Sequence, residues 1–313
     1  MAAASLCLAL LAACSPVPGG ASPSASASAS PTPSASATPA LDLTRPGVAR
    51  TLIRDLVAAS GSRQIVMVLI RQKEASVSVL TDGQPHTWAY RGGSIKEVSS
   101  DLSYVGQATF DPDAFDLSDI GALFRAAAAV SGSDSAQELQ IVDSRRVEHS
   151  AIELKMSVAT NPETRTVFFN ADGTLVPTLD FNTATGIATG LSDAIGTHSA
   201  ATAVIVGSAT GAEIEYPGAD GATTVRRTRA SKLPVTDVPR SGSDKLPGFD
   251  PRVVSPVVIW RVLQRYAAQG GFGPTTTWSM TADIRTADTL PRLRFAIGSA
   301  RLTTDLQGNE VTQ

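Results

Sequence analysis

Apolar side chains recur with helical spacing at two places in this chain, 139 residues apart. Spacings of three, four, seven and eight residues place such side chains on one face of a helix. The first stripe consists of Ile120, Leu123, Phe124, Ala127 and Ala128, and the second of Ile259, Val262, Leu263, Tyr266 and Ala267. Asp116 and Ser255 correspond at the same offset, and both are residue types that cap helix N-termini. The pattern predicts two amphipathic helices of the same kind, each beginning near its capping residue.

The segments around these stripes repeat as well. An earlier helix is predicted in each copy by Val48, Leu52 and Leu56 and then by Ile187, Leu191 and Ile195. Apolar runs at 65–70 and 203–206 predict strands, and the dipeptides at 82–83 and 220–221 are Asp-Gly hairpin turns. Alternating apolar residues predict a later strand in each copy: Ile152, Leu154, Met156 and Val158, then Leu293, Phe295 and Ile297.

These elements predict an α+β fold of two homologous lobes, residues 41–179 and 185–313. Each lobe is expected to run helix, hairpin strands, loop, helix and three or four antiparallel strands, with both helices covering one apolar sheet face. Each copy is expected to close with a short turn and strand, at 172–176 and at 307–311. Glycines at 186 and 190 weaken the first helix of the second copy.

The N-terminal segment is typical of a secreted lipoprotein. Residues 1–14 read MAAASLCLALLAAC, a short apolar run that ends in small residues before Cys14. The stretch Leu11-Ala12-Ala13-Cys14 resembles the bacterial lipobox, which implies a signal peptide at 1–13 and acyl chains such as palmitate on Cys14. No Lys or Arg precedes the apolar run, which indicates either a start codon placed too late or a non-functional leader.

Residues 14–40 are predicted to form a disordered tether. After Cys14 they are almost entirely Ser, Ala, Pro, Thr and Gly, and such segments bury too little apolar surface to offset their ordering entropy. A flexible coil of this length spans about 28 Å on average. The tether would hold the folded part away from a membrane, and its Ser, Thr and Pro residues are also typical of O-glycan acceptors.

Composition removes several classes of function. A net charge of -3 gives no broad positive field, so nucleic acid is not an expected partner. Both cysteines lie in the leader at positions 7 and 14. We therefore expect neither a disulfide nor a thiolate metal site in the mature chain. No segment after the leader reaches 18 uninterrupted apolar residues, so a later membrane span is not expected.

Two resemblances follow from these features. The helix, antiparallel strands and turn Phe168-Phe169-Asn170-Ala171-Asp172-Gly173 resemble the PepSY-type modules of secreted bacterial proteins, over 116–176 and 255–311. The leader, tether and Ala/Asp/Arg-rich composition resemble the secreted lipoproteins of actinobacteria. These resemblances imply a cell-surface location and a binding or modulating role. They carry no catalytic residue over to this chain.

Motifs for catalysis or metal binding are weak. The histidines His86, His149 and His198 lack zinc-site spacing. The acidic run Asp111, Asp113, Asp116 and Asp119 lacks the Gly and Glu of a calcium loop, and Asp116 and Asp119 fit the start of a helix instead. Ser192 lies in a Gly-Leu-Ser-Asp-Ala stretch without the final Gly of a nucleophile elbow. No catalytic residue, metal ligand or cofactor is predicted.

The best candidate for binding is a strand that differs between the copies. Arg226, Arg227 and Arg229 follow the second hairpin turn, where the first copy has Trp88 and Tyr90 on one strand face. This difference indicates a strand that contacts lipid headgroups, wall polymer or a partner protein. The alternative is a solvated face together with ordinary packing of Trp88.

Three functions remain open. The first is a lipid-anchored, non-enzymatic binding or structural module on the outer face of the cytoplasmic membrane, with an envelope protein, wall polymer or lipid as its ligand. The second is a carrier that holds an apolar lipid between sheet and helices. The third is a hydrolase that uses carboxylates such as Asp143, Glu148 or Asp283. A deep apolar cavity in one lobe would favour the carrier, and filled lobes with an exposed groove would favour the binding module.

Overall fold

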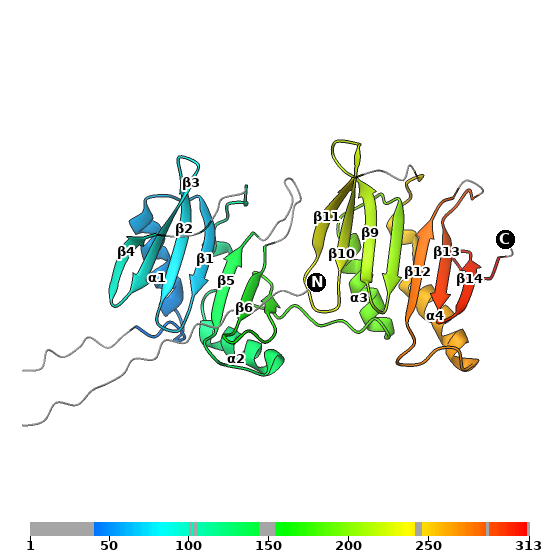
Figure 1. Cartoon of the computed structure of the whole chain (residues 1–313), viewed down its shortest axis with the longest axis horizontal. Helices are drawn as coiled ribbons and strands as arrows, with labels where there is room; N and C mark the ends of the chain where they lie inside the picture. The colour runs from blue at the N-terminus through cyan, green and yellow to red at the C-terminus, as the bar shows by residue number, and fades with distance from the viewer. Residues whose placement is uncertain are drawn as a thin grey trace, which may run out of the picture. The chain divides into compact units, whose positions relative to one another are not determined.

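The computed structural model describes residues 41–99, 102, 106–143, 154–241, 246–285 and 288–311. Within these residues the chain is α+β, with two seven-stranded antiparallel sheets and four α-helices (Figure 1). The predicted fold class and the antiparallel sheets are therefore confirmed. Residues 40–313 form one compact unit, and both apolar cores consist of residues from this unit alone.

The first sheet is built from residues 65–169. Helix α1 (Val48–Ser60) precedes four strands that form a meander of hairpins, and α2 (Ile120–Ser131) precedes three more. The strands are β1 (Ile65–Ile70), β2 (Ala75–Thr81), β3 (Gln84–Arg91), β4 (Ser94–Val98), β5 (Glu138–Val142), β6 (Met156–Ala159) and β7 (Val167–Phe169). Their order is β4-β3-β2-β1-β5-β6-β7, so the chain returns from the β4 edge to pair β5 with β1.

The second sheet repeats this order. Helix α3 (Ala184–Ile195) precedes four strands, and α4 (Pro256–Ala268) precedes three. The strands are β8 (Ala203–Gly207), β9 (Gly211–Pro217), β10 (Thr223–Arg229), β11 (Thr236–Ser241), β12 (Trp278–Asp283), β13 (Arg292–Ile297) and β14 (Ala300–Thr304). Their order is β11-β10-β9-β8-β12-β13-β14, which matches the first sheet strand for strand.

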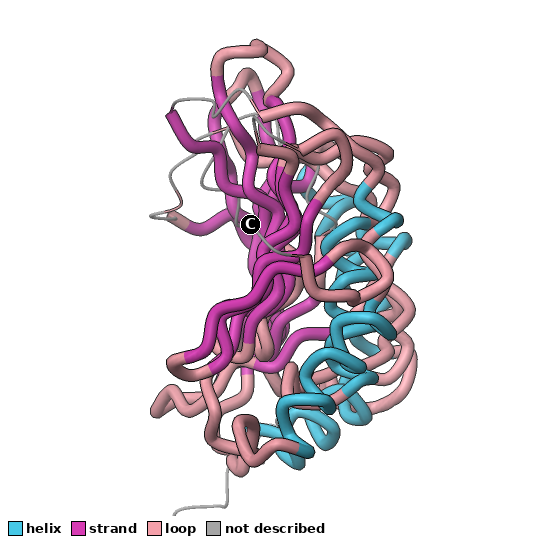
Figure 2. The backbone as a smooth tube through the Cα atoms, turned by 90° about the vertical axis from the view of Figure 1, so that its right-hand side faces the viewer, coloured by secondary structure: helices cyan, strands magenta, loops and turns pink. Residues whose placement is uncertain are grey.

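Both helices of each half cover one face of its sheet (Figure 2). The apolar stripes predicted from the sequence point into the layer between helices and sheet, because Ile120 and Ile259 are fully buried and belong to different cores. The alternating residues Leu293, Phe295 and Ile297 of β13 are buried as well. The two cores share no residue, so each half is stabilised by its own apolar layer.

The predicted start of α2 is wrong by three residues. Asp119, not Asp116, is the N-cap, and its carboxylate accepts a hydrogen bond from the Ala122 backbone N–H. Asp116 instead accepts from the Ser118 N–H and forms an ion pair with Arg50 of α1. Ser255 is the N-cap of α4, although its side chain makes no capping hydrogen bond. Helix α2 begins at the first residue of its apolar stripe, Ile120, whereas α4 begins at Pro256, about one turn before the corresponding Ile259.

The strands also differ from the prediction in detail. Four strands precede the second helix of each half, where hairpin strands followed by a loop were predicted. Strands β4 and β11 were not predicted, because they carry too little apolar alternation. The predicted closing strands are only isolated bridges, Phe169 with Leu175 and Thr304 with Glu310. Strand β6 begins at Met156, and residue 152 of its predicted alternation lies outside the described residues.

The glycines of α3 have a packing role. A Cβ atom at Gly190 would lie 2.4 Å from the Phe181 ring, and one at Gly186 would lie 1.9 Å from the Asp180 carbonyl oxygen. These close approaches let the segment before the helix lie directly on it. Phe181 and Leu179 both belong to the second core, so the helix forms despite its glycines because tertiary packing outweighs helix propensity.

The signal peptide and tether predicted at 1–40 lie outside the described residues. The description begins at Leu41, the predicted start of the folded part. Among the helices that are described, none combines the length and the hydropathy that a bilayer span requires.

Candidate functional site

The structure divides the predicted binding arginines between the two faces of the second sheet. Arg227 and Arg229 face α3. Their cross-strand neighbours on β9, Ile214 and Ala212, are buried in the second core, and residues directly opposite each other share a sheet face. Arg226 lies on the opposite face, where its guanidinium forms ion pairs with Glu213 and Glu215. The three side chains therefore do not form one basic surface, and each has an acidic partner within the protein.

Arg229 does not fit the predicted role in binding. Only 1% of it is exposed. Its guanidinium donates to Asp193 of α3 and to the backbone carbonyls of Pro177, Ala230 and Leu233. Buried charges are stable in proteins only when they are paired and hydrogen-bonded. Arg229 is thus an internal cross-link between β10, α3 and the segment that enters the second half.

Arg227 belongs to a polar cluster at the end of α3. It donates to the Ala194 carbonyl, where the helix ends, and pairs with Asp237 at 3.3 Å. Burial raises the pKa of Tyr216 to about 12, and the nearby Asp237 carboxylate adds to the shift. His198 stacks on Tyr216 with ring centroids 4.2 Å apart. Burial, with a further contribution from Arg227, lowers the pKa of His198, so the ring is neutral at physiological pH.

Trp88 and Tyr90 occupy the corresponding places in the first half. They are half-buried on β3 and pack against the first core. Trp88 corresponds to Arg227 and Tyr90 to Arg229, because 139 residues separate the members of each pair. The strand face next to the first helix therefore carries aromatic rings in the first half and guanidinium groups in the second. Packing accounts for the aromatic pair, and the role of Trp88 and Tyr90 in binding stays a prediction.

The other candidate side chains are engaged in local structure. His86 Nδ1 lies 2.8 Å from a Glu97 carboxylate oxygen, and His149 lies outside the described residues. Asp111 accepts from the Asp113 N–H, and the Asp113 carboxylate pairs with Arg54. Ser192 lies within α3 and is exposed. Among the described residues no group of three or more His, Cys, Asp or Glu side chains could hold a metal ion.

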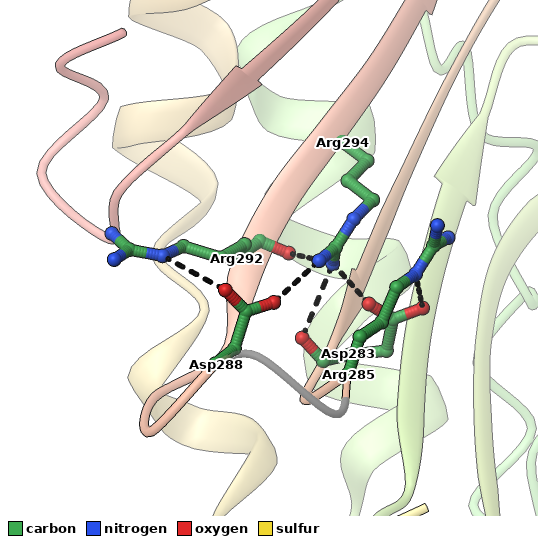
Figure 3. Close-up of polar contacts among 5 residues, drawn as sticks. All are labelled: Asp283, Arg285, Asp288, Arg292 and Arg294. Carbon is green, nitrogen blue, oxygen red and sulfur yellow. Dashed lines mark hydrogen bonds and ion pairs between the residues drawn. The ribbon is translucent and has the colours of Figure 1, made fainter. Parts of the chain in front are cut away.

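Asp283 lies in a network of charges at the hairpin between β12 and β13 (Figure 3). Its carboxylate is 8% exposed and pairs with Arg294 and Arg285. Asp288 binds the same Arg294 and also Arg292. Burial raises the pKa of Asp288, but the hydrogen bond and charge of Arg294 outweigh it and leave the pKa lowered. Both carboxylates are thus fixed by arginines across the hairpin.

The two other carboxylates considered for a hydrolase do not join Asp283. Asp143 is buried at the end of β5, where it accepts a hydrogen bond of 2.7 Å from the Ala108 N–H. Glu148 lies outside the described residues. No pair of free carboxylates at catalytic spacing is found among these described side chains, so the structure adds no support to the hydrolase hypothesis.

The first half contains an open groove of about 1020 Å³, which we call the α2 groove. It lies between α2, the turn that joins β1 to β2, and the loop that leads from α2 into β5. Phe124, Ala128 and Ala159 are its apolar lining. Its polar and charged lining consists of Thr44, Arg71, Gln72, Lys73, Glu74, Arg125, Asp134, Gln137, Glu138, Thr160 and Asn161, and Gly121 and Ala136 complete it.

The charges around the α2 groove are only partly neutralised. Arg71 binds Glu138, with the Nη2 and Oε2 atoms 2.5 Å apart, and lies 3.8 Å from Glu74. Arg125 is 75% exposed, and its closest acidic oxygen, on Asp119, is 4.0 Å away. Lys73 and Asp134 form no ion pair within the described part of the chain. Charges of both signs are therefore available to a ligand above an apolar floor.

The corresponding region of the second half differs at each of these features. At the offset of 139 residues, Trp260 stands in place of Gly121, which lines the α2 groove. The β8–β9 turn is Ser208-Ala209-Thr210, without the charges of Arg71–Glu74, and Gln264 replaces Arg125. The second half thus has a tryptophan and neutral residues at positions where the first half has a glycine and charged residues.

Comparisons of this chain with protein-family models, with curated proteins and with solved structures find no match. The site must therefore be judged on its geometry. The α2 groove was not predicted from the sequence. Small residues such as Gly121 help to form it, and a small residue by itself does not indicate a binding site. A signal was present in the repeat itself, where a glycine in one copy corresponds to a tryptophan in the other.

Proposed function

We propose that this chain is a lipid-anchored, non-enzymatic binding protein of the cell envelope, held at the outer face of the cytoplasmic membrane by acyl chains on Cys14. We propose further that the α2 groove is its ligand site. The support for the anchor is the apolar leader with its lipobox-like ending. The support for the binding role is the groove itself, together with the location and role that the resemblance to secreted lipoproteins and PepSY-type modules implies.

The observation that carries the binding proposal is the difference between the halves. We infer that they are homologous lobes that arose by duplication, because their strand orders agree and corresponding residues keep an offset of 139. If the lobes are homologous, the fold alone does not dictate the lining of the first-lobe groove, since Trp260 stands in the second lobe where Gly121 stands in the first. A groove lined by a glycine and charged residues, whose counterparts in the other lobe are a tryptophan and neutral residues, is what specialisation for a ligand would produce.

The chemistry of the groove favours a peptide-like ligand that carries both charges. Arg125 and Lys73 would receive acidic groups, and Asp134 would receive a basic group. Phe124 and Ala128 offer an apolar surface for a side chain between them. A purely apolar lipid would leave these charged groups without partners on a desolvated rim, which costs free energy.

A groove-filling substitution tests the proposal. Ala128→Trp places a large ring inside the α2 groove, whereas Ala129→Trp puts the same ring on the neighbouring exposed position of the helix. A pool of random octapeptides would be passed over the immobilised protein, and the retained peptides would be sequenced. We expect the wild-type protein and Ala129→Trp to retain peptides with at least one acidic and one basic residue, and Ala128→Trp to lose at least about tenfold of that retention.

Two outcomes would contradict the binding proposal. One is equal retention by Ala128→Trp and the wild-type protein. The other is co-purification of a stoichiometric lipid in native mass spectrometry of the protein released from its own membrane, which would favour the lipid carrier. Circular dichroism of both variants separates loss of binding from loss of folding.

The anchor has its own test. Cys14→Ser removes the thiol that would carry the diacylglyceryl group, so we expect the protein to lose the membrane association that resists a high-salt wash. Intact mass of the membrane-extracted wild-type protein should show the added lipid and cleavage before Cys14. An unmodified Cys14 would contradict the lipoprotein assignment without affecting the groove.

A further inference from the structure

Helix α4 (orange in Figure 1) exposes large apolar side chains at its N-terminal end. Val257 is 64% exposed in the first turn, and Val253, at the end of the short turn before the helix, is 42% exposed. Trp260 is half-buried three residues after Val257 and therefore lies beside it on the helix surface. Burial of apolar side chains is favourable, so an exposed group of this kind indicates a surface that meets something apolar.

The same face carries positive charge. Helix α4 contains Arg261 and Arg265 and no acidic residue. Arg261 is exposed, lies one turn after Val257, and makes no ion pair with any residue that the structure describes. Arg252 precedes the helix and is 3.5 Å from its partner Asp250. We call Val253, Val257, Trp260 and Arg261, with Arg252 at their border, the α4 face.

The acidic groups nearby are used in their own turns. The Asp250 carboxylate accepts a hydrogen bond from the Arg252 backbone N–H. The turn that contacts Arg265 contains Asp305, which accepts from the backbone N–H groups of Gln307 and Asn309 and from the Asn309 side chain. Hydrogen bonding to its carboxylate lowers the pKa of Asp305. These carboxylates do not cover Arg261, so its charge faces outward.

The exposed faces of the other helices differ. On α1 the exposed residues include Arg54, which is paired with Asp113, and Asp55. On α2 they include Ala129 and Arg125. On α3 Ser192 is exposed. An exposed valine beside an arginine without an ion pair is therefore specific to α4 among the helices that the structure describes.

We propose that the α4 face rests on the surface of a bilayer that contains anionic lipid. The valines would enter the boundary between headgroups and acyl chains, and the half-buried Trp260 would lie at headgroup level. The guanidinium group of Arg261 would meet lipid phosphates, which arginine binds in bidentate geometry. This contact goes beyond ligand binding in the α2 groove and does not depend on the acyl anchor, because it is made by the folded chain.

Residues 40–313 are sufficient for the test, because they form one compact unit that contains both cores. Sedimentation with vesicles of equal parts phosphatidylglycerol and phosphatidylcholine would be compared with sedimentation with phosphatidylcholine alone. We expect binding to the anionic vesicles that falls about fivefold in Arg261→Gln, since one cationic side chain contributes about that much at such a surface. In Val257→Glu we expect a loss of at least about tenfold.

Leu233→Glu is the matched control for Val257→Glu. It introduces the same charge at an exposed apolar residue in the turn after β10, at the end of the sheet opposite to the start of α4. Arg63→Gln, in the exposed loop after α1, is the control for Arg261→Gln. Both controls should bind like the wild-type protein.

The proposal is wrong if the wild-type fragment stays in solution with anionic vesicles, or if the α4 variants and their controls bind equally. Absence of vesicle binding combined with a concentration-dependent dimer that Val257→Glu disrupts would assign the α4 face to a second copy of the chain instead, and would also overturn the bilayer proposal.

Discussion

Arg229 shows how a charged residue in the sequence can become an internal support in the fold. Its guanidinium bonds join α3, the segment at Pro177 and the turn after β10. Removal of a buried cation leaves several acceptors without donors, and each unpaired group costs free energy. The internal partners of Arg229 therefore indicate that it stabilises the fold rather than binds a ligand.

We expect Arg229→Met to lower the free energy of unfolding of the second half by about 3 kcal/mol. Methionine keeps much of the volume but leaves Asp193 and three backbone carbonyls without this donor. The control Arg54→Met removes an exposed ion pair with Asp113 and should cost less than about 1 kcal/mol. Urea unfolding of residues 40–313 measures both, and equal effects would show that the Arg229 network contributes no more than a surface pair.

His198 gives the second half a dependence on pH. Burial lowers its pKa in the folded chain below the ordinary value of 6.5, so the unfolded chain binds the proton more tightly. The stabilising contribution of the neutral ring is fully present above about pH 6.5 and decreases as the pH falls toward the folded pKa.

We therefore expect the melting temperature of the wild-type protein to fall between pH 7.5 and pH 5.5. In His198→Gln the fall over this range should be smaller, because no imidazole remains at that position to take up a proton on unfolding. Differential scanning calorimetry at several pH values measures the slope. An identical slope in both proteins would show that His198 is not the group responsible.

At the scale of the elements, α3 is a helix that depends on small residues. Gly190 lies against the Phe181 ring, and a Cβ at that position would be 2.4 Å from it. Alanine is the better helix former by about 1 kcal/mol, yet here the added methyl group overlaps a buried ring. The overlap outweighs the gain in helix propensity.

Gly190→Ala is accordingly expected to destabilise the second half by about 1–3 kcal/mol. The double variant Gly190→Ala with Phe181→Leu should recover part of this loss relative to the sum of the single substitutions, because the smaller side chain leaves room for the methyl group. Chemical unfolding of the four proteins gives the coupling free energy. A coupling of zero would mean that the contact with Phe181 does not explain the glycine.

The elements that could be predicted from the sequence are those with a strong period. The stripes of α2 and α4 and the alternation of β13 follow directly from the order of residues. Strands β4 and β11 could not be found in this way, because edge strands are polar on much of their surface. The sequence alone does not identify the start of α2, because several Asp residues before the helix can all serve as caps.

The candidate site was less accessible to sequence reasoning. From the sequence alone, Arg227 and Arg229 are expected to be solvent-exposed. Their acidic partners come from other elements of the fold, Asp237 from β11 and Asp193 from α3. The α2 groove is a space between side chains, and no single residue type in a sequence predicts such a space. Only the pairing of Gly121 with Trp260 across the repeat carries that information.

At the scale of the whole molecule, the separate cores predict separate unfolding. Ile120 and Ile259 are corresponding residues, each fully buried in its own core. Ile259→Ala should cost about 2–5 kcal/mol in the second half and leave the first half unchanged, and Ile120→Ala should do the reverse. Amide hydrogen exchange resolved by mass spectrometry would show in which strands protection falls. Loss of protection in both sheets from either substitution would indicate one cooperative unit.

Two sheets of the same strand order in a single chain also create a folding hazard, since a strand of one can insert into the other before either is complete. The exchange of Trp88 and Tyr90 for Arg227 and Arg229 works against this error. If β3 took the place of β10, Asp193 and Asp237 would lose their cations, and if β10 took the place of β3, two guanidinium groups would enter an apolar layer. We therefore expect the divergence of this strand pair to favour correct strand pairing in each half during folding.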